Sequence, residues 1–155
     1  MNPGAGSPDL IEPAGPTDPT ASFIFLREPN GKPIALFSSY SLHYVGGVDN
    51  GDISSDYYGV YCEKLKELLS PQNNSFVALM ANGTSGDINN INFKTPRGRQ
   101  KPYEQMTIVA NDLATKVAAL AAVAAVFVAV PPVTQPPQPK PTTASAMAPM
   151  TAPHT

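Results

Sequence analysis

Two glycine-containing loops hold most of the residues in this chain whose types and spacing could do chemistry. The first runs over residues 40–59 and contains His43, a potential metal ligand and one of only two histidines in the sequence. The second runs over residues 81–90. Glycine lets a backbone approach a substrate or ion closely, and loops often carry function. Surface turns use the same residue types, so spacing alone does not separate a site from a turn.

Two short strands are predicted before the first loop. Residues 22–27 and 33–40 are rich in β-branched and aromatic residues. Between them lies the pair Asn30-Gly31, which supplies the positive φ of a hairpin turn. The first loop is therefore expected to leave the end of a strand.

Two helices and a third strand are predicted after the first loop. Residues 57–69 have apolar positions at near-helical spacing, with Asp56 as the expected N-cap. Residues 76–80 form a short apolar run that is typical of a strand buried on both faces, and the second loop follows it. The apolar pattern from residue 103 to about 129 predicts a second helix, with Glu104 near its positive N-terminal end.

The predicted order, β-β-α-β-α, indicates an α/β fold, a small mixed layer with functional groups on the loops that leave the strands. Composition divides the chain into a Pro/Gly-rich lead-in loop (residues 1–21), a domain (22–116) and a final region (117–155). That region begins as an Ala/Val-rich helix end and continues as a Pro/Ala/Thr-rich tail, which we expect to be disordered. The apolar run 117–130 is shorter than the roughly 18 to 20 residues that cross a bilayer, so a helix end is favoured over a membrane anchor.

Charge and cysteine content exclude several classes of partner and site. The formal net charge of -2 gives no field that would attract nucleic acid. The basic cluster Lys94, Arg97, Arg99 and Lys101 could bind an anionic headgroup or phosphate, but its interleaving with proline and glycine is more typical of a solvated loop. The single cysteine, Cys62, excludes an internal disulfide and a zinc site built from several thiolates.

The first loop and its flanks resemble a known family. Residues 37–59 contain a strand, one histidine, the Gly46-Gly47 turn, a Gly-Asp-Ile-Ser run and an Asp-Tyr-Tyr-Gly run that leads into a helix. This order is similar to the N-terminal catalytic domain of neutral/alkaline non-lysosomal ceramidases. Residues 76–92 support the resemblance, because Gly86-Asp87 lies where that family has an active-site Gly-Asp loop. The resemblance covers residues 22–116, and it implies that this stretch is part of a larger α/β hydrolytic domain.

The resemblance implies a zinc-dependent amidase that hydrolyses the N-acyl linkage of a lipid-like substrate such as a sphingolipid amide. His43 corresponds to a zinc ligand of the family, whereas a lone loop histidine elsewhere more often only forms hydrogen bonds. Zinc lowers the pKa of a bound water to about 7, which provides a nucleophile at neutral pH. The cofactor expected from the resemblance is therefore Zn²⁺.

The second loop departs from the family at the nucleophile. Ceramidases carry a serine and then a proline after the Gly-Asp pair, and here those positions read Asn89 and Asn90. A carboxamide is not a nucleophile. Three alternatives remain: metal-activated water attacks the substrate, Thr84 or Ser85 replaces the serine, or the domain no longer cleaves ceramide.

Other residues of the second loop have candidate supporting roles. Asp87 could orient a ligand or hold the loop through an Asx-type bond, of which the structural role is favoured. Asn82, Asn89 and Asn90 could donate hydrogen bonds to a developing oxyanion, or could simply form turns. We expect Asn82, Gly86 and Asn90 to bind the substrate.

The family's remaining zinc ligands come from an earlier histidine-rich motif and from later acidic and tyrosine residues, and neither region is present in this sequence. His154 lies in the tail and is a poor ligand candidate. We therefore expect the chain to be a fragment of a longer gene, and a shifted reading frame would fit the tail's composition. Relatives of this kind are exported or periplasmic, although no signal peptide can be read here. A non-catalytic binding module of the same fold and a small membrane-tethered protein remain as alternatives.

Overall fold

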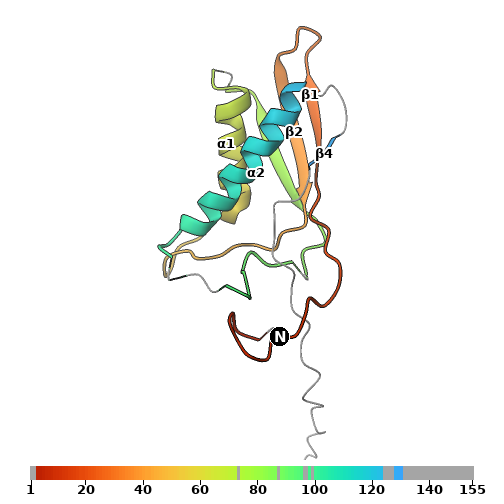
Figure 1. Ribbon diagram of the computed structural model, residues 1–155. Coiled ribbons are helices and arrows are strands. Elements are labelled where there is room, and N and C mark those ends of the chain that lie inside the picture. The colour runs from red at the N-terminus through yellow and green to blue at the C-terminus, as the bar shows by residue number, and fades with distance from the viewer. Residues whose placement is uncertain are drawn as a thin grey trace, which may run out of the picture.

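The computed structural model describes residues 3–72, 74–86, 88–95, 98, 100–123 and 128–130, and Figure 1 shows their arrangement. The predicted order β-β-α-β-α is confirmed, and a short further strand follows it. The elements are β1 (Ala21–Arg27), β2 (Pro33–Tyr40), α1 (Asp56–Leu69), β3 (Val77–Asn82), α2 (Glu104–Val123) and β4 (Val128–Val130).

The strands form one mixed sheet in the order β3-β2-β1-β4. β1 and β2 pair as the expected antiparallel hairpin, and Gly31 in its turn has a φ of 88°. β2 and β3 pair in parallel, with α1 as the connection between them. Because parallel neighbours end at the same edge of a sheet, the loops after β2 and β3 leave the sheet together, at its lower end in Figure 1.

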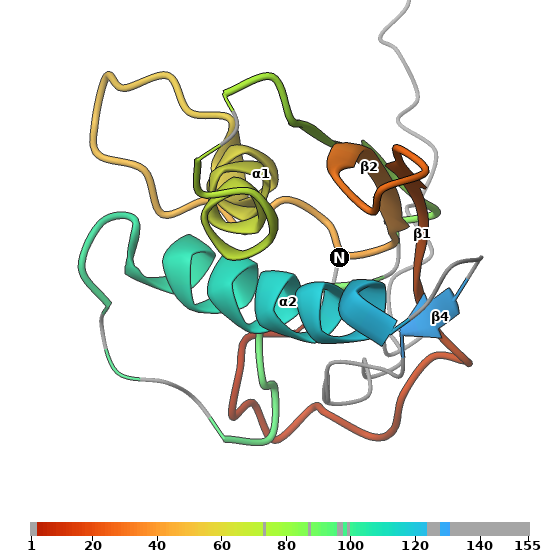
Figure 2. The ribbon, with the colours of Figure 1, turned by 90° about the horizontal axis from the view of Figure 1, so that it is seen from above.

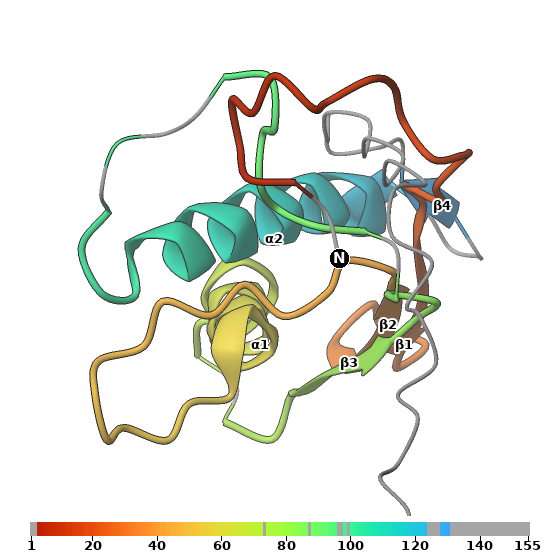
Figure 3. The ribbon, with the colours of Figure 1, turned by 90° about the horizontal axis from the view of Figure 1, so that it is seen from below.

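Both helices cover the same face of the sheet, as the views from above and below show (Figures 2 and 3). The core lies between these two layers, and the Arg27 guanidinium on β1 donates a hydrogen bond to the carbonyl of Ala121 near the end of α2. Large side chains that are completely or almost completely buried come from both layers: Phe23, Leu36 and Tyr40 from the sheet, Tyr57, Tyr61 and Leu65 from α1, and Met106, Leu113 and Val117 from α2.

The second helix ends earlier than the sequence pattern predicts. α2 stops at Val123, and residues 128–130 form β4 and pair with β1, so the expectation of a helix to about residue 129 was wrong. β-branched valines favour extended backbone where a strand edge is available to pair with them. Val117 and Ala121 are buried, so the packed core continues beyond residue 116. Residues 131–155, which were expected to be disordered, lie outside the residues that the structure describes.

α2 is the one described helix that is long and apolar enough to cross a membrane by length and composition. Its inner side, however, is part of the core: Met106, Ala110, Leu113, Ala114, Val117, Ala118 and Ala121 are all buried. A core helix of a globular domain passes the same test of length and composition, and the burial of this stripe accounts for its apolar character.

The opposite face of the sheet is apolar and exposed. Ile24, Leu26, Phe37, Val77 and Leu79 are 40–53% accessible to solvent. Cross-strand pairing places Ile24 beside Phe37 and Phe37 beside Leu79, so these side chains form a continuous surface. The expectation that residues 76–80 form a strand buried on both faces was therefore wrong, because β3 is an edge strand with one face in solvent.

Candidate functional site

Main-chain hydrogen bonds join the two candidate loops at the end of the sheet. The amide of Gly83 donates to the carbonyl of Tyr40 (2.9 Å), which continues the β2–β3 pairing beyond the last residue of β3. Further along, the amide of His43 donates to the carbonyl of Ile88 (3.2 Å). The parallel register of β2 and β3 thus brings the two loops together.

An open cleft of about 710 Å³ lies between these loops and the segment that leads into α2. Side chains capable of hydrogen bonding dominate its wall, and both sequence-predicted loops contribute to it. The lining residues are His43, Tyr44, Val45, Gly46, Gly47, Val48, Asp49, Asn89, Asn90, Ile91, Gln100, Lys101, Pro102 and Gln105.

His43 stands half-buried in the wall of this cleft. Its ring lies 3.9 Å from the ring of Tyr44, centroid to centroid, at an angle of 49°. Nδ1 lies 3.4 Å from the carbonyl oxygen of Tyr44, a long contact for a hydrogen bond. Among the described residues, this contact is the one hydrogen bond of the ring, and His43 lines the cleft.

The head of α1 holds the backbone that follows His43. Asp56 accepts hydrogen bonds from the amides of Val45 (2.8 Å) and Gly46 (2.7 Å), one on each carboxylate oxygen, and from its neighbour Tyr57 (2.6 Å). Asp56 has a φ of 55°, a left-handed conformation that aspartate tolerates better than most residues. The N-cap position belongs to Ser55, so the expectation of Asp56 as N-cap was wrong: its carboxylate binds the loop instead.

Two tyrosines of α1 hold the backbone that precedes His43. The hydroxyls of Tyr57 (2.7 Å) and Tyr58 (3.3 Å) both donate to the carbonyl of Leu42. Their rings are stacked with centroids 4.2 Å apart. Burial is the main cause that raises the pKa of Tyr57 well above its ordinary value, and the nearby Tyr58 hydroxyl raises it further. The Tyr57 hydroxyl therefore stays protonated and remains a donor at neutral pH.

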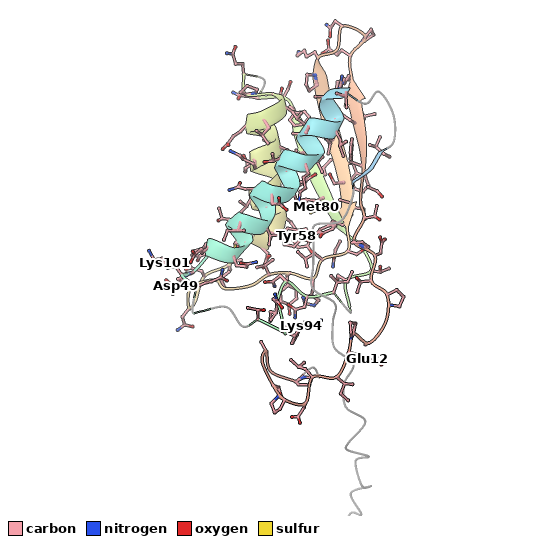
Figure 4. All side chains as sticks on the ribbon, viewed as in Figure 1. Glu12, Asp49, Tyr58, Met80, Lys94 and Lys101 are labelled. Carbon is pink, nitrogen blue, oxygen red and sulfur yellow. The ribbon has the colours of Figure 1, made fainter. Side chains whose placement is uncertain are left out.

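The start of α2 fixes the far end of the first loop. Tyr103 has a φ of 66°, and its amide donates to the carbonyl of Gly47 (2.8 Å). Its hydroxyl donates to the carboxylate of Asp52, which raises the pKa of Tyr103. This arrangement brings the start of α2 to the cleft, where Asp49 and Lys101 lie near its N-terminal end (Figure 4).

The second loop contributes only part of its candidate residues to the cleft. Asn89 and Asn90 line the cleft with His43. By contrast, the candidates earlier in the loop contact their own segment or its neighbour. The side-chain amide Nδ2 of Asn82 donates to the hydroxyl of Ser85 (2.8 Å), and the hydroxyl of Thr84 lies 3.4 Å from that of Ser41. These three residues and Gly86 do not line the cleft. Asp87 lies outside the described residues.

The donor set of the described residues fits one corner of a zinc site and not a complete site. Catalytic zinc takes three protein ligands and one water. Among the described residues, no three His, Cys, Asp or Glu side chains come together. Of the described residues that line the cleft, His43 and Asp49 are the two potential zinc ligands.

Several site residues were not found by sequence reasoning. Asp49, Lys101 and Gln105 line the cleft although they lie far apart in the sequence, and no local motif marks them. Lys101 was interpreted as part of a basic cluster, for which a solvated loop was favoured over binding of an anionic headgroup or phosphate. The Asp-Tyr-Tyr run at the head of α1 was visible, but nothing local indicated that its side chains hold the first loop.

Comparisons of the chain with protein-family models, with curated proteins and with solved structures found no match.

Proposed function

We propose that the cleft is part of the active site of a ceramidase-like, zinc-dependent amidase that hydrolyses the N-acyl linkage of a lipid-like substrate. One observation carries the proposal: His43 and the pair Asn89–Asn90, which the resemblance assigns to one active site, line one cleft. Their loops are joined by the hydrogen bond from the amide of His43 to the carbonyl of Ile88.

Each side chain has a role that suits its chemistry. His43 would hold the metal, and a bound zinc would supply a water whose pKa is lowered to about 7. Asn89 and Asn90 would donate hydrogen bonds to the substrate carbonyl oxygen, where negative charge develops during attack at an amide. Lys101 adds positive charge at the cleft mouth, which suits a polar or anionic part of the substrate. Since His43 and Asp49 are the potential ligands in the cleft among the described residues, the proposal requires at least one further metal ligand from outside those residues.

The metal content of the purified protein tests the proposal. The wild-type protein is expected to take up zinc in stoichiometric amount, and His43→Ala should lose it. His154→Ala is the matched control, because it removes the only other histidine and should leave the zinc content unchanged. The metal site is refuted if the wild-type protein binds no zinc and His43→Ala changes neither metal content nor stability. Activity on a fluorogenic N-acyl sphingoid substrate then tests the reaction itself.

A second candidate function is a binding module that keeps the fold and the cleft without hydrolysis. The carboxamides of Asn89 and Asn90 at the positions of the family's nucleophile segment favour it, as does the lack of a three-ligand group among the described residues. Such a module would bind the N-acyl compound without zinc and release it unchanged. Calorimetric titration of the metal-free protein with an uncleaved N-acyl amide distinguishes the two candidates.

A further inference from the structure

We propose that the segment Asp56-Tyr57-Tyr58 is a positioning device for His43. The role of His43 as a ligand rests on the proposed function, but the restraint of its backbone does not. Three consecutive side chains at the head of α1 bind main-chain groups on both sides of His43. They hold the carbonyl of Leu42 before it and the amides of Val45 and Gly46 after it.

The restraint leaves the His43 backbone little freedom. The carbonyl of Leu42 accepts two hydroxyl hydrogen bonds, and the amide of His43 donates to Ile88 in the second loop. The carboxylate of Asp56 accepts the amides of Val45 and Gly46 at 2.8 and 2.7 Å, short enough for charge-assisted bonds. With these groups fixed, the remaining freedom of His43 is the rotation of its side chain. A ligand held in this way loses less conformational entropy when it binds.

The backbone of Asp56 separates this role from ordinary helix capping. A helix start needs only a side chain that accepts hydrogen bonds from its own first amides, and Ser, Thr, Asp or Asn at the N-cap provides this. Here the carboxylate follows the N-cap position, at a φ of 55°, and two of its three hydrogen bonds go to the first loop. Such backbone conformations are costly and are kept where the surrounding structure requires them. The geometry of Asp56 therefore serves the loop that carries His43.

Amide hydrogen exchange and ring relaxation measured by NMR on the metal-free protein test the proposal. The two histidine ring signals are assigned with His43→Ala. Asp56→Asn keeps the size of the side chain and its tolerance for positive φ, but it places an amide donor against one of the loop amides. Tyr57→Phe removes one of the hydroxyls that hold Leu42. Each variant is expected to speed exchange of the His43 amide by about tenfold or more and to increase the mobility of its ring, because a hydrogen bond to a buried or charged partner is lost.

Tyr61→Phe is the matched control. Tyr61 is a buried tyrosine of the same helix with an equally enclosed hydroxyl, but its hydrogen bond goes to Ser38 and not to the first loop. The Tyr61→Phe variant should lower the free energy of unfolding. It should speed hydrogen exchange of the His43 amide no more than it speeds exchange of amides in the core. Equal effects of Tyr57→Phe and Tyr61→Phe on His43, or no effect of Tyr57→Phe, would overturn the positioning role. Tyr57→Phe keeps the test valid if Asp56→Asn fails to fold. Absence of zinc binding would refute the proposed function alone, because the ring and the amide are observed without metal.

Discussion

Replacing Tyr61 with phenylalanine should lower the free energy of unfolding by about 1–3 kcal/mol, the cost of leaving a buried polar group without a partner. The hydroxyl of Tyr61 lies 2.6 Å from that of Ser38, and both residues are 0% exposed. Phenylalanine keeps the ring and its packing, so the change isolates the hydrogen bond between α1 and β2. Ser38→Ala should have a similar effect, because it leaves the Tyr61 hydroxyl buried and unpaired.

The double variant distinguishes a hydrogen bond from a loss of packing. Ser38→Ala with Tyr61→Phe removes both hydroxyls, so neither is left unsatisfied, and its cost should be smaller than the sum of the two single costs by about 1 kcal/mol or more. Urea unfolding followed by far-UV circular dichroism provides all four free energies, provided that the slope with denaturant stays constant. Single variants within about 0.5 kcal/mol of the wild type, or a fully additive double variant, would refute this reasoning.

Three further outcomes follow from burial and close contact. Burial raises the pKa of Tyr57 and Tyr61 above the ordinary value of 10.0, so above pH 10 the unfolded chain releases protons that the folded chain keeps. The contribution of these tyrosines to the free energy of unfolding is therefore fully present below pH 10, and it should fall as the pH rises, by up to about 1.4 kcal/mol per pH unit for each tyrosine. Urea titrations from about pH 9 to 11.5 should show a shallower fall in Tyr61→Phe than in the wild type. An unchanged slope would contradict this. Burial also raises the pKa of the Cys62 thiol, so DTNB at pH 8 should label the folded protein much more slowly than the urea-unfolded chain, and equal rates would refute the burial. Gly83→Ala should cost about 1–3 kcal/mol in a thermal or urea melt, because a Cβ there would lie 2.5 Å from Oγ and 3.2 Å from Cα of Ser41. Adding Ser41→Ala should restore only part of that loss, and full recovery would show that the backbone contact is unimportant.

Local sequence patterns predicted the elements whose stability is mainly local. The hairpin follows from Asn30-Gly31 between two β-rich runs, and α1 follows from apolar residues at helical spacing. The end of α2 could not be predicted in this way. Residues 128–130 have a choice between continuing a helix and pairing with β1, and that choice depends on a strand more than one hundred residues earlier. Likewise, the apolar run of residues 76–80 does not reveal whether a second layer covers its outer face.

The candidate site was predictable in its position and not in its details. The resemblance assigned His43 and Asn89 to one active site, and the parallel pairing of β2 and β3 brings their loops to the same cleft. Lys101 and Gln105 line the cleft where Tyr103 binds the first loop, which is a tertiary contact that no local motif encodes. The carboxylate of Asp56 follows the same rule. Its position before a helix suggests a cap, whereas two of the three amides that donate to it lie in another loop.

The exposed apolar face of the sheet affects how this protein responds to fluorescent dyes. ANS binds to accessible apolar surface, and its binding is commonly taken as a sign of a molten state. Ile24, Phe37 and Leu79 present such a surface in the folded protein. The native state should therefore bind ANS before any unfolding occurs, and the fluorescence should fall when cooperative unfolding separates the three strands. For this chain, bright ANS fluorescence together with native circular dichroism is expected of the folded protein with its sheet intact, and not of a molten state.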